Sequence, residues 1–203
     1  MVGLKNITIG GPQGVPGKGY GSFYKLDERG PFIIGRSWEA NSPVSQDVVL
    51  ESKYVSTPHC FIIPYRGRFY LGDFGSKNGT YLNEDRVPSS FESKIFKDSI
   101  SDVQKQIMHS VFWTEEDGSS RLISLREPQE GFGKGMSKEE KIAYLKQSFN
   151  DRLCEKNFKE RIIRNGDVEI LKNRDIIGVA DYRLRFHQGF FDKIINRILS
   201  KRS

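Results

Sequence analysis

Short apolar runs separated by turn residues fill the first half of the chain, and they limit its fold more than any other feature. Between residues 22 and 82 each run is three to six residues long, is rich in Ile, Val, Phe and Tyr, and is bounded by Gly, Pro, Asn or Asp. Segments this short and frequent have the spacing of a β-sandwich. The sequence therefore predicts strands at 22–26, 31–36, 47–50, 59–64, 68–73 and 80–82.

Four further strands are indicated near the end of the chain. Asn165-Gly166 stands between two apolar runs, and this dipeptide is a strong signal of a β-hairpin. We therefore expect strands at 161–163 and 168–171, followed by strands at 176–179 and 182–186. The sandwich is thus expected in two parts, a first part over 22–87 and its closing strands over 166–187.

The stretch between these two parts has a different pattern of apolar residues. Apolar residues recur at helical spacing over 97–110, and a hairpin is indicated over 112–125. We interpret 88–165 as an inserted α+β segment, because a structureless loop of this length is uncommon in a compact domain. Its apolar faces are expected to pack on the sandwich and on one another.

The clearest helix lies within this insertion. Ser137 and Glu140 have the spacing of a capping box, which begins a helix. Ile142, Leu145, Phe149 and Leu153 continue one face of the same helix. The sequence therefore predicts a helix over 138–154.

The two ends of the chain differ from the sandwich. Residues 10–21 are rich in glycine and contain two prolines, so 1–21 is predicted to be a flexible N-terminal arm. Residues 188–203 place apolar side chains on one stripe and bases off it, which predicts a basic amphipathic helix. We rank packing back on the domain first for this helix, a partner helix or dimer contact second, and a membrane surface third.

Composition narrows the class of function. Of the net charge of +6, six bases against two acids between residues 181 and 203 supply +4, so the rest of the chain is nearly neutral. A nucleic-acid partner is therefore not expected. No apolar run is long enough to cross a membrane, and no secretion signal is recognised at the N-terminus. Cys60 and Cys154 lie outside any CxxC pattern, which favours a reducing, intracellular location, cytoplasmic or nuclear.

Polar motifs interrupt the strands at four places. Gly35-Arg36 ends one strand, and Ser56-Thr57-Pro58-His59 leads into another. Ser76-Lys77-Asn78-Gly79-Thr80 follows the next hairpin, with Asn83 three residues later. Leu171-Lys172-Asn173-Arg174-Asp175 precedes a closing strand.

In this order and spacing the chain resembles the forkhead-associated (FHA) domain family. The family pattern is G-R, then S-x-x-H, then S-x-N-G-T-x-x-N, then L-x-x-G-D-x-I-x-x-G. The resemblance covers 31–87 and 171–186, and it implies a mainly β fold, an FHA-like sandwich of two packed sheets. Arg174 stands where the family has glycine, and the family normally has a short connection where this chain has the insertion.

The residue types in these motifs suit a phosphorylated peptide. The Arg36 guanidinium is a planar, permanently charged fork that matches a phosphate dianion. Ser56 and Thr57 add short hydroxyls and backbone N–H groups, and Lys77 adds a second positive charge. Asn78 can hydrogen-bond the backbone of an extended peptide.

The resemblance implies the same roles. Residues at the positions of Arg36, Ser56 and Asn78 contact phosphate and peptide backbone in the family, and those of Thr57 and Lys77 are auxiliary contacts. Gly35, His59, Gly79 and Asn83 are at positions that hold the loops. Family members prefer phosphothreonine to phosphoserine, because the threonine methyl fills a small pocket. No metal or cofactor site is indicated, since the histidines and cysteines have no ligand spacing.

We therefore predict a phosphopeptide-binding adaptor that recognises phosphothreonine in a partner protein, as a monomer or weak oligomer. The alternative is a phosphate-independent scaffold that uses its insertion or C-terminal helix as the interaction surface. An enzyme is not expected. Asp73-Phe74-Gly75 matches a kinase string without the other kinase motifs, and Gly17-Lys18 lacks the rest of a phosphate-binding loop.

Overall fold

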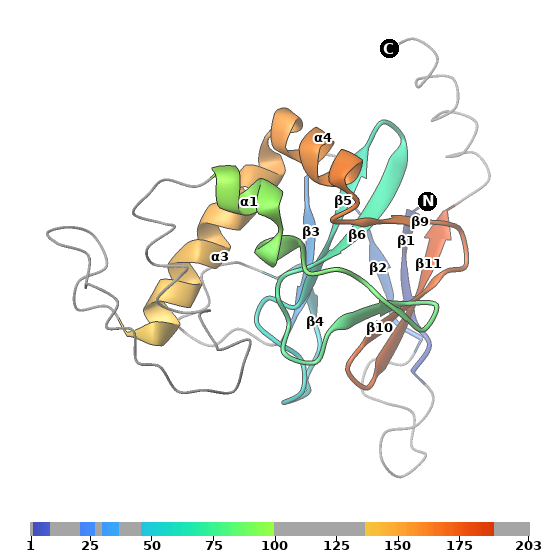
Figure 1. The fold of residues 1–203 in the computed structure, drawn as a ribbon. Helices are drawn as coiled ribbons and strands as arrows, with labels where there is room; N and C mark the ends of the chain where they lie inside the picture. Colours follow the sequence, from blue (N-terminus) through green and yellow to red (C-terminus); the bar gives the residue numbers. More distant parts are fainter. Residues whose placement is uncertain (1, 9–20, 27–29, 37–45, 100–136, 189–203) are drawn as a thin grey trace, which may run out of the picture.

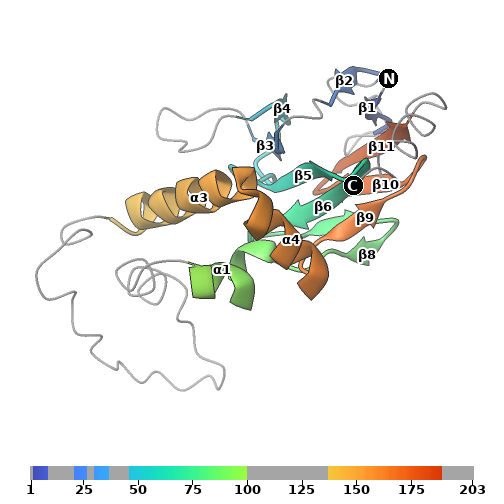
Figure 2. The same ribbon diagram turned by 90° about the horizontal axis from the view of Figure 1, so that it is seen from above.

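Two mainly antiparallel β-sheets pack face to face, and three helices cover the outer face of the second sheet (Figures 1 and 2). The structure, a computed structural model, describes residues 2–8, 21–26, 30–36, 46–99 and 137–188. The first sheet has the strand order β2-β1-β11-β10-β7-β8, and the second has the order β4-β3-β5-β6-β9. The mainly β sandwich predicted from the sequence is therefore confirmed.

The strands are β1 (Val2–Asn6), β2 (Phe23–Lys25), β3 (Phe32–Gly35), β4 (Val48–Val49), β5 (Cys60–Tyr65), β6 (Arg68–Asp73), β7 (Thr80–Leu82), β8 (Asp85–Arg86), β9 (Glu169–Leu171), β10 (Ile176–Val179) and β11 (Tyr182–Gln188). The helices are a 3-10 turn η1 (Ser90–Glu92), α1 (Lys94–Ser99), α3 (Lys138–Cys154) and α4 (Lys156–Asn165). All strand pairs are antiparallel except β3 with β4.

The second sheet is buried on both faces, which explains its continuous apolar runs. Ile34 and Ile62 point into the sandwich core together with Leu4, Leu71, Leu184 and Phe186. Ile33 and Phe61, the alternate residues of the same strands, belong to a second core under the helices. A strand buried on both faces has no polar side to alternate with, so it reads as an unbroken apolar run.

The second core contains a cluster of phenylalanines centred on Phe149 of α3. Ring centroids of Phe61, Phe74, Phe91, Phe96 and Phe158 lie 5.6, 5.2, 5.7, 4.8 and 5.7 Å from the Phe149 centroid. These residues come from β5, the end of β6, η1, α1 and α4, so Phe149 joins the insertion to the sandwich. The expected packing of the insertion on the sandwich is confirmed for its described residues.

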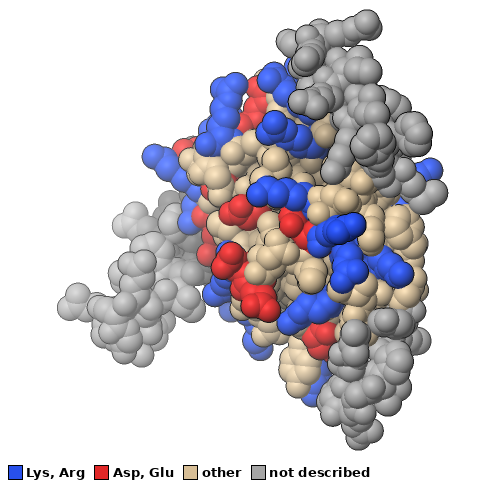
Figure 3. Space-filling model, turned by 90° about the vertical axis from the view of Figure 1, so that its right-hand side faces the viewer, with Lys and Arg blue, Asp and Glu red and all other residues tan. Residues whose placement is uncertain are grey.

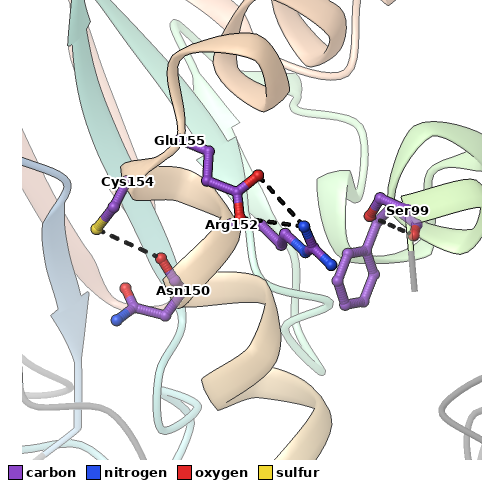
Figure 4. A network of polar contacts seen from close by, with 6 residues as sticks. Ser99, Asn150, Arg152, Cys154 and Glu155 are labelled. Atoms are coloured by element: carbon purple, nitrogen blue, oxygen red, sulfur yellow. Dashed lines mark hydrogen bonds and ion pairs between the residues drawn. The ribbon is translucent and has the colours of Figure 1, made fainter. Parts of the chain in front are cut away.

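Helix α3 begins and ends as the sequence predicts. The Glu140 N–H donates to Ser137 Oγ at 3.2 Å, and the Ser137 N–H donates to Glu140 Oε2 at 2.6 Å, which completes the capping box. At its other end Arg152 pairs with Glu155, and the Cys154 thiol lies against the Asn150 carbonyl (Figure 4). These exposed contacts are local to the junction between α3 and α4.

The strand predicted at 161–163 and the hairpin at Asn165-Gly166 are wrong, because this segment is helix α4. Phe158 and Ile162 are four residues apart and both buried, which is helical spacing. Gly166 has φ +78° and ends the helix, and the Asp167 N–H donates to the Ile162 carbonyl at 3.0 Å. A left-handed glycine after a helix is a common C-cap, and the same residue types also suit a hairpin turn.

The prediction of a flexible arm over 1–21 is wrong for its first residues. Residues 2–6 form β1, which pairs with both β11 and β2, and Leu4 lies opposite Phe186. Val2 and Leu4 are buried in the sandwich core. The pattern was missed because the strand is followed at once by the glycine-rich stretch, whose residues 9–20 lie outside the described structure.

Other expectations fall on residues that are not described. These are most of the helix expected at 97–110, the hairpin at 112–125 and the amphipathic helix at 188–203, of which only 97–99 and Gln188 are described. The boundaries of the insertion at 88 and 165 stay a prediction. Among the described residues, no helix is long and apolar enough to cross a membrane.

The outer face of the first sheet carries several basic side chains, and acidic side chains lie among them (Figure 3). Lys5, Lys25 and Arg185 point outward from adjacent strands, and Figure 3 looks onto this side of the molecule. Burial and the nearby charges of Arg185, Lys5 and Arg174 lower the pKa of His187. Arg185 is one of the six bases counted between residues 181 and 203, and Lys5 and Lys25 come from the other end of the chain.

Candidate functional site

Three loops meet at one end of the sandwich. Arg36 follows β3, Ser56 and Thr57 precede β5, and Lys77 and Asn78 lie between β6 and β7. Ile34 lies opposite Cys60, and Cys60 lies opposite Asp73, so the end of β3, the start of β5 and the end of β6 are adjacent. The strand register therefore brings all five predicted phosphopeptide-binding residues to the same end.

Ser56 connects the three loops. The Arg36 backbone N–H donates to the Ser56 carbonyl at 3.0 Å. The Lys77 backbone N–H donates to Ser56 Oγ at 3.1 Å. The Ser56 hydroxyl is thus held by one neighbour and keeps a proton that it can donate to a ligand.

Asn78 lies at the exposed rim of the site. Its side-chain Nδ2 donates to the Tyr54 carbonyl at 2.7 Å, which joins the β6–β7 loop to the loop before β5. Tyr54 itself is 55% exposed, and the Lys53 ammonium lies 5.1 Å from its ring centroid. Tyr54 was not predicted from the sequence, although its place two residues before Ser56 was the available signal.

The buried His59 side chain connects the Ser56 loop to the Asn78 loop through two hydrogen bonds. Its Nδ1 accepts from the Ser56 N–H at 2.9 Å, so the ring proton lies on Nε2, which donates to the Gly79 carbonyl at 3.1 Å. Burial lowers the pKa of His59, against smaller raising effects of the Gly79 carbonyl and Asp73. The histidine is therefore neutral near pH 7, and its two hydrogen bonds connect the two loops.

The β6–β7 loop is built around a buried carboxylate that the sequence analysis did not single out. Asp73 accepts hydrogen bonds from the Ser76 N–H at 2.8 Å, from the Ser76 hydroxyl, and from the Thr80 hydroxyl at 2.6 Å. The two ends of the loop that carries Lys77 and Asn78 are thus fixed to one side chain. An aspartate three residues before a serine is a common local turn, which was the available signal.

Gly35 allows the close approach of the Ser56–Pro58 segment. A Cβ on Gly35 would lie 3.2 Å from both the Pro58 Cα and the Ser56 carbonyl oxygen. Since these are backbone atoms, they cannot move aside without moving the site. The residue before Arg36 is therefore restricted to glycine by packing.

Asn83, predicted to hold a loop, lies away from the Ser56 junction. It lies at the other end of β7, where its Nδ2 donates to Asp175 and its Oδ1 accepts from the Ile176 N–H, both at 2.9 Å. It therefore braces the turn before β10. Arg174 in that turn has φ +78°, so it keeps the left-handed backbone of the glycine that it replaces in the family pattern.

A lysine of helix α3 also contacts the site, and no sequence motif pointed to it. Lys146 of α3 is only 7% exposed, and its Nζ donates to the Pro58 carbonyl at 3.3 Å. Burial lowers the pKa of Lys146 to about 8, although the negative charge of Asp73 opposes this change. The loop that carries Ser56 and Thr57 is thus contacted from behind by the insertion.

Gly79 is expected to be less tolerant of alanine than Gly166. Both have a left-handed φ, +76° and +78°, which costs a non-glycine residue about 1 kcal/mol. A Cβ on Gly79 would also lie 3.0 Å from Arg86 Nε, whereas the space at Gly166 is open. We expect Gly79→Ala to lower the free energy of unfolding by about 1–3 kcal/mol and Gly166→Ala by about 1 kcal/mol. Urea denaturation measures both, and equal losses would show that Arg86 moves aside freely.

Comparison with known proteins points to one family. The model of the FHA domain matches residues 32–99. The FHA domain-containing protein FhaB of Mycolicibacterium smegmatis is 34% identical over 65 residues, which are 32% of this chain and 38% of that protein. The chain thus spans well under half of the length of this curated relative.

Solved structures align with most of the chain at low sequence identity. Full-length yeast Pml1p is 17% identical, with a TM-score of 0.44, over 92% of this chain and 81% of that one. An FHA domain studied for phosphothreonine-dependent interactions is 15% identical, with a TM-score of 0.43, over 93% and 96% of the two chains.

Proposed function

We propose that the chain is an adaptor that recognises phosphothreonine in a partner protein, because residues 32–99 match the model of the FHA domain. FHA domains are interaction modules rather than enzymes. The observation that carries the proposal is the junction of three loops on Ser56, with Arg36, Lys77 and Asn78 around it.

Each group at this junction has a task in binding a phosphate dianion. The Arg36 guanidinium supplies charge and paired donors, and the Ser56 hydroxyl supplies one more donor. Lys77 is exposed beside them and adds charge that attracts the ligand from solution. The Asn78 side chain exchanges its bond to the Tyr54 carbonyl for bonds to the peptide backbone, which fixes the direction of the peptide.

The loops are held before any ligand arrives. Asp73 and His59 fix the Ser56 and Asn78 loops through buried hydrogen bonds. A site whose donors are already in place loses less conformational entropy on binding. This preorganisation supports a recognition role, because affinity for a short phosphopeptide depends on few contacts.

The test compares oriented peptide libraries that carry phosphothreonine, phosphoserine or unmodified threonine. We expect binding to the phosphothreonine library, weaker binding to the phosphoserine library and none to the unmodified one in fluorescence polarisation. The preference for the threonine methyl follows from the resemblance to the family. Equal binding of all three libraries would contradict the proposal.

The alternative of a phosphate-independent scaffold has less support. In the part of the chain that the structure describes, the exposed large hydrophobics are Phe23, Val49, Tyr54 and Tyr81, and none of them lies in α1, α3 or α4. The buried phenylalanines and leucines of the described insertion instead belong to the second core. They are therefore already used for packing within the chain.

A further inference from the structure

Lys146 is a buried cation on helix α3. Removing an ammonium from water is costly, and a single hydrogen bond to a carbonyl does not offset the cost. The neighbours of Lys146 along the buried stripe of α3 are the apolar Leu145, Phe149 and Leu153. A methionine at position 146 would cover the same surface without the cost of burying a charge.

Lys146 contacts the loop that carries two of the predicted phosphate-binding residues. The Pro58 carbonyl that accepts its hydrogen bond belongs to the segment Ser56-Thr57-Pro58, which carries two of the predicted phosphate contacts. The front of this segment is fixed at Ser56 by Arg36 and Lys77. Lys146 of the insertion thus holds the same segment at its other end, through the Pro58 carbonyl.

The titratable groups around Lys146 come from the two strands beneath it. Asp73 at the end of β6 is negative and favours the ammonium, and His59 before β5 is neutral because burial lowers its pKa. Cys60 stays a thiol because burial and Asp73 raise its pKa. Among these groups, therefore, Lys146 alone changes its charge between pH 7 and pH 9.5.

We propose that Lys146 is a positioning residue of the phosphopeptide site, through which the docking of α3 sets the affinity for phosphate. The proposal rests on the proposed function for its ligand. Loss of the proton weakens the donor to the Pro58 carbonyl and removes a positive charge behind a site for a dianion. The insertion is then part of the binding module, because its helix supplies this contact.

The sign of the pH effect follows from linkage. A bound phosphate dianion stabilises the Lys146 ammonium, so binding raises the pKa of Lys146 from its value of about 8 in the free protein. Affinity is then full below pH 8 and falls as the pH rises through 8 and above. The phosphate group stays a dianion over this range, because its second pKa is about 6.

The first experiment measures phosphothreonine-peptide affinity for the wild type, Lys146→Met and Lys146→Arg from pH 7 to pH 9.5. We expect Lys146→Met to bind roughly 5- to 30-fold more weakly at pH 7 and to lose the pH dependence of the wild type. Lys146→Arg keeps its charge, so it is expected to bind without a fall above pH 8. Lys141→Met, the same change on the same helix, serves as the matched control and is expected to bind like the wild type.

Stability separates positioning from general structural support. Urea denaturation is expected to show Lys146→Met as stable as the wild type or more stable, because removing the desolvation cost of the buried ammonium offsets the loss of its attraction to Asp73. Weak binding together with unchanged stability supports the proposal. Wild-type affinity of Lys146→Met at pH 7 would overturn it, and so would a loss of binding that merely follows a loss of stability.

The second experiment needs no ligand. The Thr57 methyl resonance in the free protein is expected to titrate with an apparent pKa of about 8, and this titration is expected to be absent in Lys146→Met. An unchanged titration in the variant would overturn the link between Lys146 and the loop. Failure of the wild type to bind any phosphopeptide would instead count against the proposed function, so the two failures are distinguishable.

Discussion

Replacing Arg36 with alanine is expected to lower the affinity for a phosphothreonine peptide by about 100-fold or more. The side chain is the charged fork of the site, and loss of a hydrogen-bonded charge from a bound phosphate costs about 3 kcal/mol or more, which corresponds to this factor. The fold is not expected to change, because the backbone N–H of Arg36 that donates to Ser56 is retained in the variant. Titration calorimetry with one phosphorylated peptide measures the loss.

Two further variants sharpen this test. Arg36→Lys keeps the charge but not the fork, so its affinity is expected to lie between those of the wild type and the alanine variant. Arg68→Ala is the matched control, because Arg68 begins β6 at the opposite end of the strand from Asp73. If Arg36→Ala and Arg68→Ala bind equally well, Arg36 has no part in phosphate recognition.

The candidate site was predictable in outline because its residues lie in local motifs. Arg36, Ser56 and Asn78 each follow or precede an apolar run, and the ends of adjacent strands in a sandwich necessarily meet. The spacing of the apolar runs therefore indicated which loops lie together in the fold. Asp73 was missed because a carboxylate at the end of a strand is common, and its three hydrogen bonds depend on the path of the loop after it.

Contacts between distant parts of the chain were beyond prediction. Lys146 and Pro58 are 88 positions apart, and a lysine within an amphipathic helix ordinarily faces solvent. Its burial depends on how α3 lies across the second sheet, which no local pattern encodes. The same holds for Asn83, whose position in the family pattern did not tell which of the two ends of β7 it braces.

The wrong prediction of a strand at 161–163 and of a hairpin at Asn165-Gly166 has a physical cause. Asn165-Gly166 supplies a left-handed backbone conformation that ends a helix or turns a hairpin equally well. Only the helical spacing of Phe158 and Ile162 distinguishes the two outcomes, and the short apolar run at 161–163 obscured it. Helix α3 was predicted correctly because its capping box and its apolar stripe agree over its whole length.

The second large effect is expected at Phe149, where alanine should lower the free energy of unfolding by about 3–5 kcal/mol. Phe149 is fully buried and contacts five other phenylalanine rings from both the sandwich and the insertion. Its removal leaves a cavity and ends edge-to-face contacts that add about 0.5–1.5 kcal/mol each. Since a small domain is stable by only about 5–15 kcal/mol, this loss is a large part of the total.

Phe23→Ala is the matched control, because Phe23 is 43% exposed on the outer face of the first sheet. We expect it to cost about 1 kcal/mol or less in the same urea experiment. Phe149→Leu keeps most of the side-chain volume, so its smaller loss of stability can be measured even if the alanine variant does not fold.

The Phe149 variants also test whether the insertion and the sandwich unfold together. Because the second core includes Phe61 of β5 as well as α1, α3 and α4, the unfolding transition of the Phe149 variants should shift as a whole. A new early transition that leaves the sandwich folded would show instead that the insertion is a separate unit, and Lys146 could not then fix the site through α3.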